Sequence, residues 1–271
     1  MTVNCRLTEL HVEDVKVDTH FALVPLAEIA EATRRHLLSL PSLIDSFLED
    51  HILNSTHYRI VVDGETAGFA SVHKEHLITQ FALDEPYRYC GQPIFQHVRR
   101  LEQVRSAFVP TCDEFFLSHA LDDYRQLAKQ AYFFNAVREV PGLKSGRYTL
   151  RLAEPQDVQL VREESGDFFE HPERHIAAGE LFVTLRGEEP VGFGLIIKSV
   201  LYAEVASIGM FTIDRFRRVG VGTATIAMLR DECRRHSLRP VAGCWYYNHR
   251  SKQTLERAGM FSATRLLKID Y

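Results

Sequence analysis

The feature that most constrains this chain is an internal repeat. Residues 77–102 align with residues 207–232 at a constant offset of 130, and residues 58–75 resemble residues 181–198. The identical pairs include Ile78/Ile208, Phe81/Phe211, Asp84/Asp214 and Arg88/Arg218. A repeat of this length is too long for a solenoid unit, so it predicts the duplication of a whole α/β domain.

Turn-forming residues separate the two halves. The segment 140–148 (VPGLKSGRY) contains a proline, two glycines and a serine, which are typical of a linker between domains. The sequence therefore predicts a first domain at 1–140, a linker at 141–147 and a second domain at 148–271. Each domain is expected to be a mixed, twisted sheet flanked by helices, in the α/β (α+β) class.

Hydrophobic periodicity gives the order of elements in the second half. Alternating or continuous apolar residues predict strands at 148–153, 181–185, 191–200 and 205–214. A glycine loop follows, and Ile226, Leu229 and Cys233 then recur at helical spacing. A strand at 240–247, a helix closed by Gly259 and a strand at 261–269 complete the expected order.

Composition excludes several classes of protein. The 271 residues are 45% hydrophobic and 25% charged, as in a globular protein with a core. Five cysteines without a C-x-x-C pair indicate neither a disulfide framework nor a zinc knuckle. No apolar run approaches the ~20 residues of a membrane-spanning helix and the start lacks a signal-peptide pattern, so we expect a cytoplasmic protein without membrane partners. Pro172 lies between His171 and His175 and no H-E-x-x-H is present, so no metal site is predicted.

Charge is distributed unevenly along the chain. The net charge of −4 argues against a nucleic-acid binder, which is usually strongly basic. Residues 215–271, however, carry 12 Lys and Arg against 4 Asp and Glu. This basic end favours either a local anion site or a solvated, arginine-rich helix face, and charge alone does not separate the two.

The glycine loop RRVGVGT at 217–223 is the strongest candidate for an anion site. Glycines between a strand and a helix let backbone N–H groups close on an anion, and the helix adds its unpaired N–H groups. A Walker loop would need a Gly-Lys pair, and a Rossmann loop would need glycine in place of Thr225. The remaining pattern is R-x-x-G-x-G, for which a pyrophosphate is the natural ligand.

Residues 148–261 resemble a domain of the GNAT superfamily, the acyl-CoA-dependent N-acyltransferases. LRLAEPQD is similar to the family's first strand and helix, and EEPVGFGLI to its central hairpin. IGMFTIDRFRRVGVGTATIAML resembles the strand, acyl-CoA loop and helix of the family, and NHRSKQTLERAGMF its closing motif. The first half resembles a degenerate copy, because Cys90 and Gln92 stand where the second half has Gly220 and Gly222.

The resemblance implies which residues bind acetyl-CoA or another acyl-CoA as co-substrate. An open strand edge would bind the pantetheine arm, the glycine loop would bind the pyrophosphate, and the start of the last helix would lie near the thioester. The implied residues are Phe211, Thr212, Ile213, Arg217, Arg218, Val219, Gly220, Val221, Gly222, Thr223, Asn248 and Ser251.

The resemblance leaves the catalytic groups less defined. Many family members carry a tyrosine seven residues after the asparagine to protonate the thiolate, but here that residue is Leu255. Some members that acetylate protein N-termini carry a serine at the position of Ser251, which is therefore the candidate acid. The alternative is a serine that only bonds the backbone or the cofactor and has no proton role. Glu204 is a weak candidate base because strand alternation turns it away from Ser207, and a water chain is the other route. Tyr246 is a weak fallback, as are Tyr247, His249 and Cys244.

We therefore expect an N-acetyltransferase with one active domain. The acceptor would be a primary amine of a small molecule or a protein N-terminus, and residues 167–175 (DFFEHPERH) are a candidate acceptor segment. The alternatives are a non-catalytic acyl-CoA-binding or sensor protein, and a CoA-dependent reaction other than N-acetylation on the same fold.

Overall fold

The computed structural model describes residues 8–12, 15–101, 103–138 and 146–271. The chain divides into two compact units, one formed by Met1–Ala131 with Thr264–Tyr271 and the other by Tyr132–Ala263. Most of the linker expected at 141–147 lies outside the described residues. No helix among the described residues is long and apolar enough to cross a membrane.

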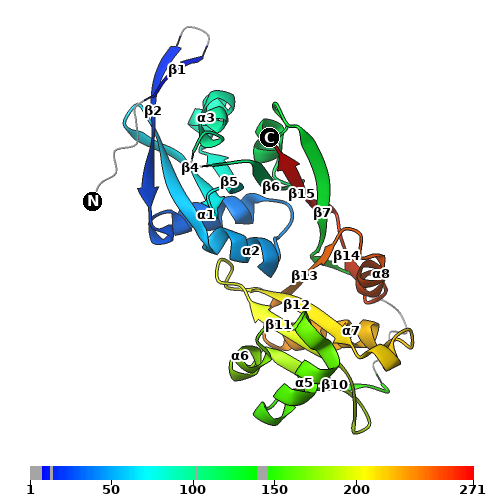
Figure 1. The fold of residues 1–271 in the computed structure, drawn as a ribbon. Helices are drawn as coiled ribbons and strands as arrows, with labels where there is room; N and C mark the ends of the chain where they lie inside the picture. The colour runs from blue at the N-terminus through cyan, green and yellow to red at the C-terminus, as the bar shows by residue number, and fades with distance from the viewer. Residues whose placement is uncertain (1–7, 13–14, 102, 139–145) are drawn as a thin grey trace. The chain divides into compact units, whose positions relative to one another are not determined.

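The first unit is a twisted sheet with helices on both faces (Figure 1). Its strands follow the order β1-β2-β3-β4-β5-β6-β15. The elements are β1 (Thr8–Val12), β2 (Val15–Val24), α1 (Leu26–Ser39), α2 (Ser46–Leu53), β3 (Ser55–Val62), β4 (Glu65–His73), β5 (Leu77–Leu83), α3 (Gly91–Val98), β6 (Ser106–Pro110), α4 (Glu114–Ala120) and β15 (Thr264–Asp270). The boundary with the second unit falls inside β7 (Gln126–Phe134).

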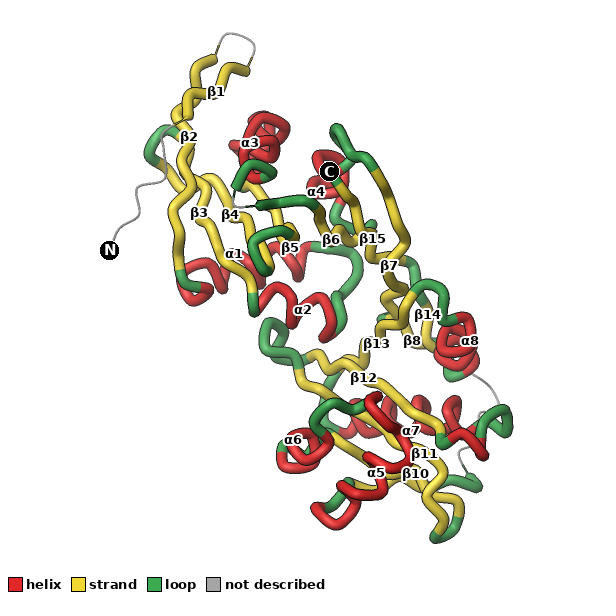
Figure 2. Tube along the Cα trace, in the orientation of Figure 1, coloured by secondary structure: helices red, strands yellow, loops and turns green. Residues whose placement is uncertain are grey.

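The second unit repeats this arrangement, with strands in the order β13-β12-β11-β10-β9 (Figure 2). The elements are β8 (Ala136–Val137), β9 (Thr149–Leu152), α5 (Val158–Ser165), α6 (Pro172–Ala177), β10 (Leu181–Arg186), β11 (Glu189–Lys198), β12 (Val205–Thr212), α7 (Val221–Arg235), β13 (Arg239–Trp245), α8 (His249–Arg257) and β14 (Met260–Phe261). The predicted mixed sheet flanked by helices is confirmed in both units.

The last strand differs from its expected position. The sequence places residues 264–271 in the second domain, whereas β15 pairs antiparallel with β6 of the first unit. Leu266 and Ile269 are fully buried, and Leu267 and Ile269 belong to the core of that unit. Leu267 and Ile269 are two residues apart and therefore face the same side of the strand, toward the core of the first unit.

A fork between two parallel strands recurs in both units. β12 pairs with β13 only over Val205–Ser207, although its other edge continues to pair with β11 as far as Thr212. In the first unit β5 pairs with β6 only at Leu77 and Ile78, while its other edge pairs with β4 as far as Leu83. The fork thus falls at the same place in the 130-residue repeat, and it leaves backbone N–H and C=O groups available on one edge.

The long helix α7 covers one face of the second sheet. Ile226, Leu229 and Cys233 are buried against β12 and β13, as their helical spacing predicts. Gly194 on β11 allows close approach, since a Cβ there would lie 2.9 Å from a methyl carbon of Leu229. Each buried aliphatic side chain contributes on the order of 2 kcal/mol, so this face holds α7 against the sheet.

Candidate functional site

A cavity of about 620 Å³ lies in the second unit beside the glycine loop. Its walls come from the end of β12, the loop, the first turn of α7 and one face of α8. The lining residues are Phe168, Met210, Phe211, Thr212, Arg217, Arg218, Gly220, Val221, Gly222, Thr223, Asn248, Arg250, Ser251, Gln253, Thr254 and Arg257. Ten of the twelve residues predicted to bind acyl-CoA therefore line one cavity.

The loop leads into the first turn of α7, whose N–H groups have no partner within the helix. The N-cap residue Gly220 has a φ of 93°, and Arg218 has a φ of 67°, so the chain turns through left-handed backbone before the helix. The first N–H to bond within the helix is that of Ala224, which donates to the carbonyl of Gly220 at 3.0 Å. The N–H groups of Val221, Gly222 and Thr223 precede it in a turn without acidic residues, which favours an anion.

The two glycines of the loop serve different purposes. A Cβ at Gly222 would lie 3.1 Å from the sulfur of Met210 and 3.2 Å from Oγ1 of Thr212, so glycine lets α7 begin close to β12. A Cβ at Gly220 would meet no atom within 4 Å, but its positive φ strains any L side chain. The surface above Gly220 is therefore open to a ligand.

The free edge of β12 enters the same cavity. Beyond Ser207 this edge has no ladder partner among the strands described, and Met210, Phe211 and Thr212 line the cavity. The Phe211 ring contacts Phe168 at a centroid distance of 5.1 Å. An extended chain that carries amide groups can add to such an edge by backbone hydrogen bonds.

Helix α8 presents Ser251 to the cavity from its first turn. The Asn248 side-chain oxygen accepts a hydrogen bond from the Ser251 backbone N–H at 3.0 Å, which caps the helix. The Ser251 hydroxyl has no hydrogen-bond partner among the residues that the structure describes. Leu255, which replaces the family tyrosine, is buried in the core and supplies no polar group.

Two arginines of α8 were missed by the sequence prediction. Arg250 and Arg257 line the cavity with Gln253 and Thr254, and none of the carboxylates described lies within ion-pair distance of either guanidinium. Arg217 differs, because its guanidinium is 2.6 Å from a carboxylate oxygen of Asp214. Residues 250, 253, 254 and 257 are spaced to share one face of a helix, and they lie in the basic end of the chain. This pattern could have indicated from the sequence that both arginines face the anion site.

Two predicted cofactor-binding residues and two predicted catalytic residues lie outside the cavity lining, as do the fallback residues Tyr247, His249 and Cys244. Ile213 is fully buried, and its N–H donates to the carbonyl of Val191. Val219 is exposed, and its carbonyl accepts a hydrogen bond from the Tyr148 hydroxyl at 3.2 Å. Glu204 is exposed just before β12, at the end of that strand remote from the loop.

Tyr246 is the second of these catalytic residues. Its ring stacks on that of Tyr132 at a centroid distance of 4.7 Å, beside the core under α7 and α8. This contact gives Tyr246 a packing role in the second unit. It leaves Ser251 as the one predicted catalytic residue that lines the cavity.

The segment expected to contact the acceptor divides between core and cavity. Phe169 is buried, whereas Phe168 is exposed and lines the cavity. His175 lies 2.7 Å from a carboxylate oxygen of Glu180, and His171 precedes α6 as its N-cap. No group of three or more His, Cys, Asp or Glu suited to a metal occurs among the described residues.

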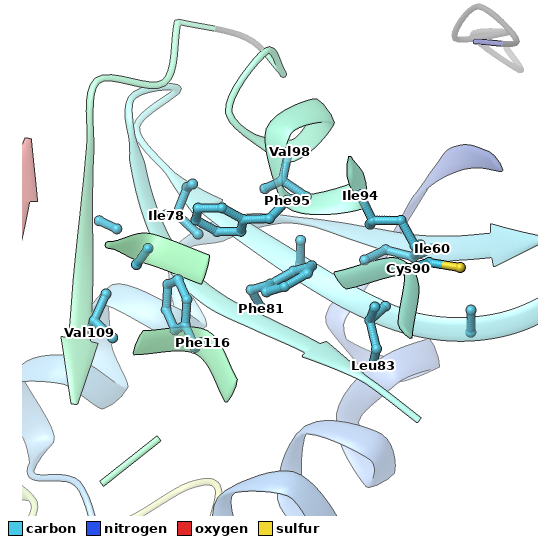
Figure 3. Close-up of a cluster of buried hydrophobic side chains, with 14 of the residues drawn as sticks. Ile60, Ile78, Phe81, Leu83, Cys90, Ile94, Phe95, Val98, Val109 and Phe116 are labelled. Atoms are coloured by element: carbon cyan, nitrogen blue, oxygen red, sulfur yellow. The ribbon is translucent and has the colours of Figure 1, made fainter. Parts of the chain in front are cut away.

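In the first unit, Phe81 lies in a cluster of buried hydrophobic side chains together with Phe95 and Phe116 (Figure 3). Phe81, the counterpart of Phe211, is fully buried and stacks on Phe115 of α4 at 5.5 Å. A Cβ at Gly91, the first residue of α3, would lie 2.3 Å from Nε2 of His119, so α4 packs directly on this helix start. Cys90 is buried in the same core. The His119 imidazole is also partly buried, and this burial lowers its pKa below the usual range.

Comparison with family models finds a match in each half of the chain. Residues 26–137 match the model described as "Acetyltransferase (GNAT) domain". Residues 148–260 match the model described as "Acetyltransferase (GNAT) family". A search of curated proteins finds no match.

Comparison with solved structures gives the same fold over nearly the whole chain. An acetyltransferase from the GNAT family of Colwellia psychrerythraea matches with a TM-score of 0.82 and 16% identity, over 95% of this chain and 100% of that one. A GCN5-related N-acetyltransferase from Sphaerobacter thermophilus matches with a TM-score of 0.61 and 14% identity, over 94% and 95%. A tandem GNAT protein from the clavulanic acid biosynthesis pathway matches with a TM-score of 0.52 and 10% identity, over 94% and 98%.

Proposed function

Because this chain belongs to the GNAT superfamily and carries two such domains in tandem, we propose that its second domain transfers an acetyl group from acetyl-CoA to a primary amine. The fold supports acyl transfer from acyl-CoA. The observation that carries the proposal is the cavity in which the start of α7, the free edge of β12 and the Ser251 hydroxyl meet.

Different residues of the cavity lining would bind successive parts of the acetyl-CoA molecule. The N–H groups of Val221, Gly222 and Thr223, with the charge of Arg218, would hold the diphosphate. The free edge of β12 at Met210–Thr212 would bind the amides of the pantetheine arm as an added strand. Asn248 and Ser251 would then lie beside the thioester.

Acetyl transfer requires that a proton be delivered to the leaving group, the thiolate of CoA. The neutral amine attacks the thioester carbonyl, the C–N bond forms and the C–S bond breaks to release a thiolate. We assign protonation of this thiolate to the Ser251 hydroxyl, which donates its proton to the sulfur and regains one from water, because it lines the cavity without another partner among the described residues. The proton lost by the amine passes to water, since Glu204 is remote from the loop and Tyr246 is stacked on Tyr132.

The first domain, proposed to span residues 1–140, binds no CoA. The rings of Phe81 and Phe115 and the imidazole of His119 fill the space that would receive it. Cys90 and Gln92 replace the loop glycines, and Pro93 removes an N–H from the first turn of α3. The active domain is accordingly proposed to be the second one, from residue 148.

The acceptor is proposed to be a primary amine of a small molecule or a protein N-terminus. Residues outside the basic end carry an excess of acidic over basic side chains. Such a surface attracts cations, and an amine acceptor is mostly protonated at neutral pH before it binds.

Turnover with a panel of amines tests the proposal. Free thiol is followed with acetyl-CoA, and products are identified by mass spectrometry as acetylated amines. Release of thiol together with an N-acetyl product is expected, and the rate should fall sharply in Gly220→Val. Tight acetyl-CoA binding without turnover of any amine would indicate a non-catalytic binding protein, and a product other than an amide would indicate another CoA-dependent reaction.

A further inference from the structure

Helix α8 carries two cations that the proposed acetyl-transfer site leaves unused. The single carboxylate of α8, Glu256, is taken by the ammonium of Lys252. Arg250 and Arg257 line the cavity, and none of the described carboxylates pairs with them. Uncompensated guanidinium groups that line one cavity repel each other and raise the local concentration of anions.

Three arginines of this basic region outside the cavity lining are paired with acidic neighbours. Arg215 pairs with Glu164 at 2.7 Å, and Arg234 pairs with Asp231 at 3.2 Å. Arg235 pairs with Glu232 on α7. Among the cavity arginines described, Arg218, Arg250 and Arg257 lack an acidic neighbour, so their charge is available to a ligand in this cavity.

An anionic group bound by Arg250 and Arg257 would be distinct from the diphosphate at the glycine loop. The diphosphate already has the N–H groups of α7 and Arg218 as donors. Arg250 and Arg257 are seven residues apart on a separate helix, which corresponds to roughly 10 Å along its axis. Long arginine side chains from both positions can converge on one group between them, and Thr254 lies between them on the same face.

Coenzyme A carries a second anionic group of this kind, the phosphate on its ribose 3′-oxygen. We propose that the arginine face of α8, formed by Arg250 and Arg257, recognises the 3′-phosphate and so makes the enzyme select CoA over 3′-dephospho-CoA. Guanidinium groups suit this role because they donate paired hydrogen bonds to phosphate oxygens. The inference rests on the proposed function, since it assumes that this cavity binds CoA.

Calorimetric affinities for CoA and 3′-dephospho-CoA test the proposal in the wild-type chain and in Arg250→Gln, Arg257→Gln and the double variant. The wild type should bind CoA about tenfold more tightly or better, the effect of one charge-assisted hydrogen bond. The double variant should lose this preference, while its affinity for 3′-dephospho-CoA stays within about twofold of wild type. Arg234→Gln, which removes an ion-paired arginine of α7, is the matched control and should keep the preference.

Three outcomes would overturn the proposal while the proposed function stands. The wild type would bind both ligands equally, or the double variant would keep its preference for CoA. In the third, the double variant would lose affinity for both ligands alike, which would assign the arginines to the diphosphate. If neither ligand binds the wild type, the proposed function fails as well.

Discussion

The side-chain oxygen of Asn248 lies 3.0 Å from the backbone nitrogen of Ser251 and accepts its N–H. The cap is thus made by the backbone of Ser251 and leaves its hydroxyl free for the cavity. A substitution at Ser251 consequently separates chemistry from helix stability, because alanine retains the capping N–H.

Ser251→Ala should lower kcat by roughly 10²-fold with little change in KM for acetyl-CoA, if the hydroxyl protonates the thiolate. Steady-state kinetics with an accepted amine measure this. Thr254→Ala is the matched control, because its hydroxyl lines the same cavity one turn later but donates to the carbonyl of Arg250 at 2.9 Å. A rise in KM with unchanged kcat would make Ser251 a binding residue only.

Gly220→Val should weaken acetyl-CoA binding by at least about tenfold while the fold persists, because a branched side chain strains the loop and covers the helix start. Gly187→Val is the matched control. Gly187 also has a positive φ, 63°, but lies in the hairpin between β10 and β11 and does not line the cavity. Calorimetry compares the two variants, and equal affinities would remove the support for the loop as the diphosphate site.

One chain should bind one CoA. The first unit has no room at the start of α3, where a side chain at Gly91 would collide with His119 and Phe115. Titration calorimetry of the wild type should give a stoichiometry near one. Cys90→Ala should leave binding unchanged, whereas Gly220→Val should weaken it. A stoichiometry near two would contradict the proposed degeneracy of the first domain.

Asp45→Asn should stabilise the protein at neutral pH. Burial raises the pKa of Asp45 from 3.8 to about 6, although its side chain caps α2 through the Leu48 N–H. Between these values the folded state binds more protons than the unfolded state, so the unfolding free energy falls as pH rises. Asparagine keeps the cap without the buried charge and should add up to roughly 3 kcal/mol at pH 7.5 and much less at pH 4.

Denaturant unfolding of both proteins at the two pH values checks this prediction. Burial lowers the pKa of His57 and His73, and these groups reduce stability below pH 6.5 in both proteins alike. Their contribution cancels in the difference between the Asp45→Asn variant and the wild type. A difference in stability that does not depend on pH would show that the Asp45 carboxyl is not the cause.

Ile269→Ala should destabilise the first unit by about 2–5 kcal/mol, although Ile269 lies at the end of the chain. Its side chain is fully buried, and β15 pairs it with Ala107 of β6. Lys268→Ala, on the partly exposed side of the same strand, is the control. Hydrogen exchange should show lost protection in β5 and β6 but not in α7 or β12; the reverse pattern would assign the strand to the second unit.

Features that depend on residues close together along the chain could be predicted from the amino-acid sequence. The repeat and its strand order, the helical spacing of Ile226 and Leu229, and the glycine loop before α7 all follow from local patterns. Backbone φ, capping and periodicity are set within a few residues, so Gly220 and Asn248 are recognisable without a structure. Family resemblance added the role of Ser251, which the cavity lining supports without testing it.

Which distant segments meet became visible only in the folded chain. Ile269 joins the core around Ala107, Arg250 and Arg257 share a cavity with the glycine loop, and His119 lies on the start of α3. Glu204 and Tyr246 lie outside that cavity for the same kind of reason, because strand direction and ring stacking fix their positions. Such contacts depend on how several elements pack together, and the free energy of that packing is not written in any one short stretch of sequence.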